Sequence, residues 1–166
     1  MFDQLTRGDI QKMQDEIDHR KLVLRPQILE ALKEAKAQGD LSENFEYYAA
    51  KRERNQNDSR IRYLERMIKT ATVIEDTSAK DEVGLNNTVT VRFEDDGSEE
   101  TFKLVTSVRV NTLNGVINKD SPLGVAVMGK KIGERVEVHV NEHVSYFVTI
   151  TKIEKTTDES EEIRKF

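Results

Sequence analysis

Two runs of helical periodicity, separated by a single glycine, dominate the sequence between Ile10 and Ile74. The second run, from about Leu41, contains neither proline nor glycine. Gly39 is a predicted C-terminal helix cap, because glycine readily adopts the left-handed conformation that ends many helices. The pattern predicts two long helices that fold back as an antiparallel coiled-coil hairpin. The stripe in the first run has spacings of three, four and seven and consists of Ile10, Met13, Ile17, Leu24, Ile28, Leu32 and Ala35.

Local signals refine this hairpin. Thr6 followed by Asp9 is typical of a helix N-terminus, where side chains satisfy free backbone N–H groups. Pro26 lies inside the first helical run, and the apolar stripe changes register there, so we interpret it as a bend or phase shift. In the second run, the segment 51–60 (KRERNQNDSR) has no apolar residue, which favours a solvated rod.

The period changes after about Thr77, where short alternating segments replace the helical stripe. The segment 121–133 predicts one short helix and a turn, and the charged tail from Thr156 is predicted to be frayed. We therefore expect an α+β chain, with a hairpin domain at 1–76 and a small, mostly β domain at 77–166. The predicted strands are Thr88–Phe93, Thr101–Val105 after an Asp96-Gly97 turn, Arg135–Val140 and Tyr146–Ile153.

Composition limits the possible functions. A formal net charge of -5 and a pI of about 5.4 disfavour nucleic-acid binding through the whole surface, so any such contact is expected in a local patch. The absence of cysteine excludes disulfides, thiolate zinc sites and cysteine nucleophiles. No window approaches the roughly 20 apolar residues that span a bilayer, and the N-terminal sequence lacks a secretory signal. We expect a cytoplasmic protein with no membrane partner.

Two acidic residues, Asp40 and Glu43, fall between the helical runs, in the segment GDLSENFEYYAAK (39–51). Their spacing allows two interpretations. Asp40 at an N-cap with Glu43 three residues later is a capping box for the second helix. Alternatively, two carboxylates at the end of a thin rod hold a hard cation such as Mg²⁺, which prefers oxygen ligands.

The residues that follow have their own interpretations. We expect Phe45 and Tyr48 to brace the first turns of the second helix against the first helix, at Leu32 and Ala35. Their neighbours are expected to face water: Asn44, Glu46 and Tyr47. The positive charges further along favour a solvated, mixed-charge helix face: Lys51, Arg52, Arg54, Arg60 and Arg62.

Three segments resemble the Gre transcript-cleavage factors of bacterial RNA polymerase, most closely the GreA type. They are GDLSENFEYYAAK (39–51), RPQILEALKEAKAQ (25–38) and SPLGVAVMGKKIGERVEV (121–138), and the resemblance extends in order over nearly the whole chain. It implies an FKBP-like C-terminal domain that docks at the rim of the polymerase secondary channel. It also implies that the coiled coil threads inward to the active centre.

The resemblance implies roles for individual residues. Asp40 and Glu43 match the tip acids that help to hold the second catalytic Mg²⁺ of polymerase and orient water for hydrolysis of backtracked RNA. The ion is then shared with polymerase and not bound independently. Lys51 and Arg52 match a basic patch that touches the RNA 3′ segment. The docking residues are expected to include Ser121, Pro122 and Leu123.

Three functions remain open at this point. The main hypothesis is an accessory factor, monomeric when free, that activates the nuclease chemistry of polymerase; retention of Asp40 and Glu43 favours it. A Gre-like inhibitor would plug the same channel. A free-standing metal-dependent nuclease would require more converging carboxylates. The stretch 105–118 (VTSVRVNTLNGVIN) lies in the docking domain and departs from the acidic stretch usual in the family, so the resemblance does not fix the strength or orientation of polymerase binding.

Overall fold

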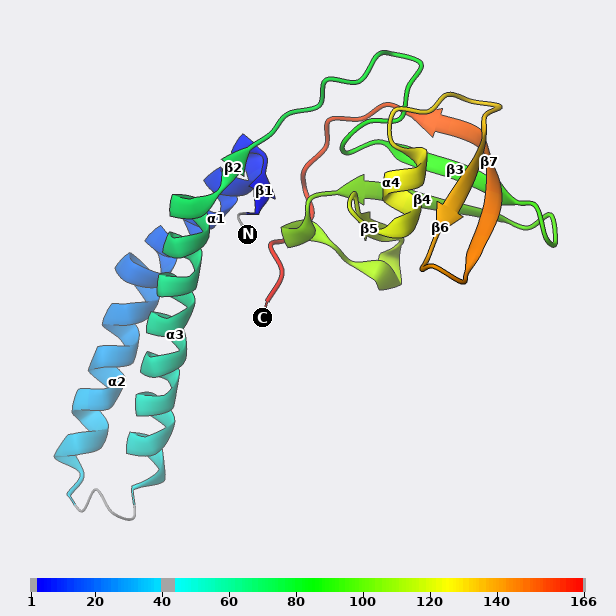
Figure 1. Ribbon diagram of the computed structural model, residues 1–166. Helices are drawn as coiled ribbons and strands as arrows, with labels where there is room; N and C mark the ends of the chain where they lie inside the picture. The colour runs from blue at the N-terminus through cyan, green and yellow to red at the C-terminus, as the bar shows by residue number, and fades with distance from the viewer. Residues whose placement is uncertain (1–2, 40–43, 166) are drawn as a thin grey trace. The chain divides into compact units, whose positions relative to one another are not determined.

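The computed structural model describes residues 3–39 and 44–165, and they form two compact units. One unit comprises Asp3 with Ile10–Ala71, and the other comprises Gln4–Asp9 with the chain from Thr72 onward. The first is a helical hairpin and the second contains a β-sheet (Figure 1). The predicted α+β class is therefore confirmed, while the domain boundary between residues 76 and 77 stays a prediction.

The first arm of the hairpin is one helical run with a single π-helical turn inside it. It consists of α1 (Arg7–His19), the π turn η1 (Arg20–Leu24) and α2 (Arg25–Ala37) (Figure 1). In this turn the N–H of Arg25 bonds to the carbonyl of Arg20, five residues back. A π turn inserts one residue into the helical register. The predicted phase shift is thus confirmed, and Pro26 sits at the first positions of α2, where its missing N–H is tolerated.

The second arm, α3 (Phe45–Thr70), packs against the first along an apolar seam near both ends of the hairpin. Gly39 has a φ of +108° just after α2, so the predicted glycine cap is confirmed. Helix α3 is shorter than predicted at both ends, and after Thr70 the chain enters the short strand β2 (Thr72–Val73), which pairs with β1 (Gln4–Leu5). The buried apolar seam residues are Met13, Ile17, Ile28, Leu32, Ala35, Ala50, Ile61 and Leu64.

The middle of the hairpin is held by buried polar groups. Asn57 and Arg60 are buried, so the predicted solvated rod is wrong for these two residues. Arg60 Nε donates to Glu16 Oε2 at 2.8 Å, and Arg20 Nη1 donates to Asn57 Oδ1 at 3.0 Å. Asn57 Nδ2 returns a bond to the Arg20 carbonyl at 3.2 Å. Apolar periodicity could not reveal this seam, because a polar side chain packs inside once its hydrogen-bonding groups are satisfied.

Glu16 is expected to make the hairpin sensitive to acid. Burial alone would raise the pKa of Glu16, but hydrogen bonds from Arg60 and Arg20 outweigh burial and lower it. A lowered folded-state pKa gives stability that is present above the unfolded-state pKa and lost as the pH falls through the folded-state pKa. We expect Glu16→Gln to be less stable than the wild type at pH 7, with the difference shrinking below about pH 4.5.

Urea denaturation followed by helical circular dichroism at several pH values measures this difference. Glu30→Gln, which replaces an exposed acid on α2, is the matched control and should follow the wild type at every pH. Parallel pH profiles for Glu16→Gln and the wild type would contradict the prediction.

The second unit contains a five-stranded sheet in the order β5-β4-β3-β7-β6. Its strand pairs are antiparallel except β4 with β5, and Gly97 turns the β3–β4 hairpin with a φ of +72°. The predicted strands are confirmed with small shifts in their ends, whereas β5 was not predicted. The strands are β3 (Thr88–Phe93), β4 (Glu99–Val105), β5 (Val116–Asn118), β6 (Arg135–His139) and β7 (Ser145–Glu154).

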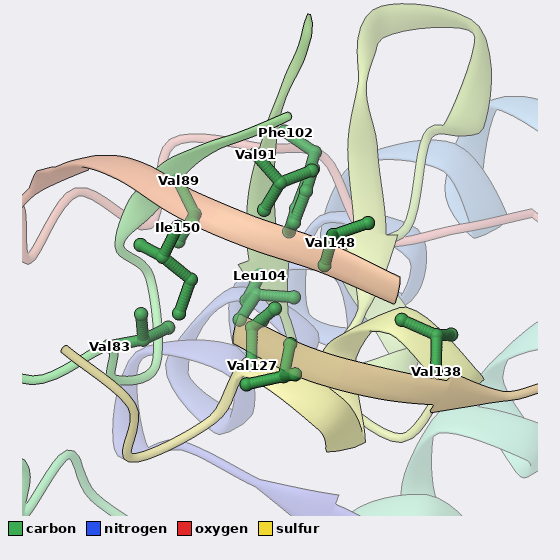
Figure 2. Packing of buried hydrophobic residues seen from close by; sticks show 10 residues of the cluster. Val83, Val89, Val91, Phe102, Leu104, Val127, Val138, Val148 and Ile150 are labelled. Carbon is green, nitrogen blue, oxygen red and sulfur yellow. The ribbon is translucent and has the colours of Figure 1, made fainter. Parts of the chain in front are cut away.

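One face of this sheet is covered by α4 (Pro122–Val127), the predicted short helix (Figure 1). Side chains of the strands and Val127 of α4 form an almost wholly aliphatic core (Figure 2). Phe102 is the single aromatic among its buried members in the described chain, in keeping with an aromatic content of 6%. Its buried members are Val83, Val89, Val91, Phe102, Leu104, Val127, Val136, Val138, Val148 and Ile150.

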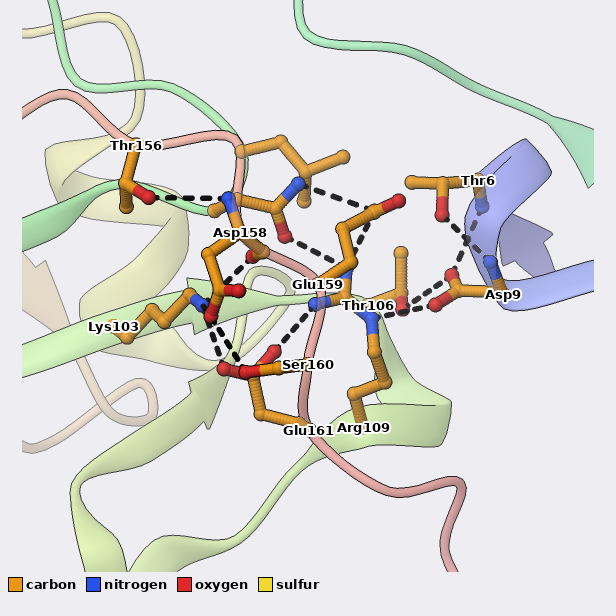
Figure 3. Close-up of polar contacts among 12 residues, drawn as sticks. Thr6, Asp9, Lys103, Thr106, Arg109, Thr156, Asp158, Glu159, Ser160 and Glu161 are labelled. Atoms are coloured by element: carbon orange, nitrogen blue, oxygen red, sulfur yellow. Dashed lines mark hydrogen bonds and ion pairs between the residues drawn. The ribbon is translucent and has the colours of Figure 1, made fainter. Parts of the chain in front are cut away.

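The C-terminal tail is held against the sheet unit, so the predicted frayed tail is wrong. The Arg164 N–H bonds to the Val108 carbonyl at 2.7 Å, and Lys103 Nζ contacts Glu161 Oε2 at 2.6 Å and Asp158 Oδ2 at 3.1 Å. Figure 3 shows how the tail acids meet these cations. Composition suggested fraying because the tail is highly charged, but basic partners elsewhere in the unit bind those charges.

Arg109 lies at the centre of this polar network and is 0% exposed. Its guanidinium contacts Asp9 at 2.5 Å, Glu161 at 2.7 Å and Glu159 at 3.0 Å (Figure 3). Asp9 and Thr6 also cap the start of α1 reciprocally, as their spacing predicted: the Thr6 N–H donates to Asp9 Oδ2, and the Asp9 N–H donates to Thr6 Oγ1. The arginine thus joins three acids from the two ends of the chain.

Within the described ranges 3–39 and 44–165, no helix has the length and apolarity needed to cross a bilayer.

Candidate functional site

The hairpin end carries the sequence-predicted site, but Asp40 and Glu43 lie outside the described residues. The structure describes the two helix ends that flank them. Helix α2 ends at Ala37, and α3 begins at Phe45. The geometry reported below is that of these flanking residues.

Asn44 joins the two helix ends through its side chain. Its Oδ1 accepts a hydrogen bond from the Tyr47 N–H at 3.0 Å, which caps the N-terminus of α3. Its Nδ2 donates to the Ala35 carbonyl at 2.7 Å, near the C-terminus of α2. An amide supplies both an acceptor and a donor, which a carboxylate cannot do. The capping interpretation of Asp40 is therefore wrong for α3, and so is the expectation that Asn44 only faces water.

We expect Asn44→Ala to lower the free energy of unfolding of the hairpin by about 1–2 kcal/mol, because it removes a cap and a bond between the helices. Asn44→Asp is the matched variant: it keeps the acceptor but lacks the donor to Ala35, so an intermediate loss is expected. Urea denaturation monitored at the helical circular dichroism band gives both values. Wild-type stability in Asn44→Ala would show that the bridge contributes nothing.

The aromatic residues after Asn44 do not brace the hairpin as predicted. Phe45 is 86% exposed and Tyr48 is 46% exposed. The prediction was wrong because the buried face of α3 runs through Ala50 and Asn57. Phe45 is five residues before Ala50, so its side chain points about 140° away from that of Ala50 around the helix axis. Tyr47 is instead half-buried, and its ring makes an edge-to-face contact with Tyr48 at 5.6 Å between centroids. Glu46 is exposed as predicted.

The basic residues of α3 separate into two kinds. Lys51 and Arg52 are exposed, and within the described ranges neither side chain makes a hydrogen bond or an ion pair. Arg60, which the sequence placed on the same solvated face, is buried and bonded to Glu16, so that prediction is wrong for Arg60. Cations at Lys51 and Arg52 therefore remain available to an anionic partner.

The three candidate docking residues lie at the start of α4. Ser121 caps this helix by accepting from the Gly124 N–H at 3.1 Å, Pro122 is exposed, and Leu123 packs partly against the core. Gly124 cannot be replaced without strain, because a Cβ there would lie 2.6 Å from the Lys119 carbonyl oxygen. Beside this turn, a cavity of about 450 Å³ is lined in part by Lys119, Asp120, Val125 and Met128.

Across residues 3–39 and 44–165, no three His, Asp or Glu side chains converge in a way that could hold a metal ion. Asp40 and Glu43, the two predicted metal ligands, lie outside these ranges. Two carboxylates have the oxygen chemistry that Mg²⁺ prefers, but this ion usually keeps additional ligands from water or a partner.

Comparisons with known proteins cover both units. The family description "Transcription elongation factor, N-terminal" matches residues 3–73, and "Transcription elongation factor, GreA/GreB, C-term" matches residues 78–155. The chain belongs to the GreA/GreB family of transcription elongation factors.

Two relatives in sequence agree with this assignment. Transcription elongation factor GreA of Chloroherpeton thalassium is 44% identical over 82% of this chain and 87% of the relative. GreA of Chloroflexus aggregans is 41% identical over 90% of this chain and 95% of the relative. Among solved structures, GreA factor homolog 1 of Thermus thermophilus is 20% identical, with coverage of 93% of this chain and 100% of that chain and a TM-score of 0.43.

Proposed function

We propose that this chain binds bacterial RNA polymerase, inserts its hairpin into the secondary channel and stimulates Mg²⁺-dependent cleavage of the 3′ end of backtracked RNA. The observation that carries the proposal is the match of both family descriptions across residues 3–73 and 78–155. The first of these ranges includes the hairpin end with its two acids.

Each of the two units would have its own role. The turn that contains Ser121, Pro122 and Leu123 would contact polymerase, supported by an exposed Pro122 beside the exposed Val125. The hairpin would deliver Asp40 and Glu43 to the polymerase active centre, supported by the Asn44 bridge, which fixes the spacing of the two helix ends. A rigid support of this kind reduces the entropy lost when the acids reach their target.

The two acids would act in trans and not as an independent nuclease site. When bound, the second Mg²⁺ of a two-metal centre stabilises the attacking and leaving oxygens during phosphoryl transfer. Asp40 and Glu43 would supply anionic oxygens toward that ion and accept a hydrogen bond from the attacking water. Polymerase would supply the remaining ligands, since two carboxylates are too few to hold the centre alone.

Lys51 and Arg52 would contact phosphates of the extruded RNA 3′ segment. Their exposure supports this role. Such contacts are independent of sequence and weaken with salt. Photocrosslinking from the RNA 3′ end should therefore label α3 near these residues.

The deciding experiment adds the chain to a stalled, backtracked elongation complex with Mg²⁺. Shortened RNA with a new 3′ end that polymerase can extend is the expected result. Slower elongation with no cleavage would instead identify an inhibitor of the same channel. Cleavage of RNA by the chain and Mg²⁺ without polymerase would identify a free-standing nuclease.

A further inference from the structure

Two exposed aromatic side chains lie at the start of α3, where the proposed function needs contact with RNA. Phe45 is the first residue of the helix and Tyr48 is one turn later. Residues three apart on a helix are neighbours on one face, so these two rings share a surface. Their exposed fractions of 86% and 46% leave them open to a partner.

The surroundings hold this aromatic surface in place. The half-buried ring of Tyr47 meets the ring of Tyr48 edge to face, with 5.6 Å between centroids. Lys36 Nζ of the opposite helix lies 6.0 Å from the Tyr47 ring centre. Asn44 fixes the first turn of α3 through its bond to the Tyr47 N–H. A stacking partner would thus meet rings whose support is already formed.

The charge on this face is positive. Lys51 comes three residues after Tyr48, and Arg52 comes four residues after it. Both cations therefore lie on the same side of α3 as the Tyr48 ring. At 100° per residue, the exposed acids Glu46 and Glu53 lie on the other side of the helix, about 160° and about 140° around the axis from Tyr48. Asp58 and Glu65 are engaged by Arg25 and Lys21 of the other arm: their ion pairs measure 3.1 Å and 2.6 Å.

We propose that Phe45 and Tyr48 form a stacking platform for unpaired nucleobases of the backtracked RNA 3′ segment, with Lys51 and Arg52 beside it on the phosphates. Aromatic rings next to cations are the combination that binds single-stranded nucleic acid, because every base has a π face and every linkage a phosphate. The inference rests on the proposed function, since that function brings RNA to the hairpin end. The inference adds a contact with the RNA bases to the roles proposed above for the two acids and for the two cations that contact phosphates.

The test compares two backtracked complexes that differ in one nucleotide of the extruded RNA, which carries either adenine or an abasic residue at its 3′ end. For each we measure the protein concentration that gives half-maximal RNA cleavage. The wild-type chain is expected to need at least about fivefold more protein on the abasic RNA, because a stacking contact is lost. The double variant Phe45→Ala/Tyr48→Ala is expected to need that higher concentration on both RNAs.

Two further variants separate stacking from other losses. Phe45→Tyr/Tyr48→Phe keeps two rings and should retain the preference for adenine. Leu22→Ala removes a side chain that is 75% exposed on the other arm and should leave the preference unchanged.

The outcomes distinguish this inference from the proposed function. Equal concentrations for the wild type on both RNAs would overturn the stacking platform while cleavage persists. The stacking platform would also be overturned if the double variant needed about fivefold more protein than the wild type but still cleaved the adenine RNA at a lower concentration than the abasic RNA. The rings would then contact polymerase and not the base. No stimulated cleavage by the wild type would overturn the proposed function and the platform together.

Discussion

Asp40→Asn and Glu43→Gln are each expected to reduce stimulated RNA cleavage on the order of 100-fold or more, without unfolding the hairpin. Each change keeps the size of the side chain but removes the negative charge that would face the second Mg²⁺. Loss of one well-placed electrostatic contact to a transition state commonly costs factors of this size. Single-turnover cleavage of the backtracked RNA at saturating protein measures the effect.

The structure gives a reason to expect that stability survives Asp40→Asn. The N-cap of α3 is Asn44, so the helix does not depend on Asp40 in that position. We expect the free energy of unfolding to stay within about 0.5 kcal/mol of the wild type. Asn44→Ala should behave in the opposite way: it keeps both acids but lowers the free energy of unfolding.

Glu46→Gln is the matched control for charge. It neutralises an exposed acid in the first turn of α3 and should leave the cleavage rate unchanged. If Asp40→Asn and Glu43→Gln cleave as fast as Glu46→Gln, the acids have no role in the chemistry. If they instead unfold the hairpin, their role is structural.

The sequence predicted those parts of the fold that apolar periodicity encodes. The helical hairpin, the glycine after α2, the phase shift before Pro26 and most strands follow from spacing and turn residues. Strand β5 (Val116–Asn118) was missed because three residues are too few to show an alternation, and its pairing with β4 depends on tertiary contacts.

The errors at the polar residues of the hairpin share one physical cause. Asn44, Asn57 and Arg60 are polar residues whose packing depends on partners in the first arm of the hairpin, such as the Ala35 carbonyl and Glu16. Periodicity counts apolar residues and cannot find such pairs. For Asn44 a signal was available, because asparagine is among the preferred N-cap residues and stands directly before α3.

Arg109 was missed for a similar reason, although its setting held a signal. The residue stands among Val105, Val108 and Val110, in the stretch 105–111 (VTSVRVN), where it is the single charged residue. A lone cation in such a stretch must find an anion when it is buried. Which acids it would find could not be deduced, because Asp9 and Glu161 are 100 and 52 residues away.

Arg109→Met is expected to lower the free energy of unfolding of the sheet unit by about 3–5 kcal/mol, the usual cost of breaking one partner of a buried ion pair. The substitution leaves Asp9, which is fully buried, without its guanidinium partner and releases Glu159 and Glu161 of the tail. Hydrogen exchange of the β4 and β7 amides measures the loss within this unit. Lys131→Met, which breaks an exposed pair with Asp81, should leave the same amides unchanged.

A double variant tests whether the uncompensated charge causes the loss. In Arg109→Met/Asp9→Asn no negative charge remains at position 9, and the amide can still accept the bond that Thr106 Oγ1 donates to Asp9 at 2.7 Å. We therefore expect the double variant to be more stable than Arg109→Met alone, although Glu159 and Glu161 stay released. Additive losses from the two substitutions would mean that packing of the arginine, and not its charge, holds the N-terminal segment and the tail to the sheet unit.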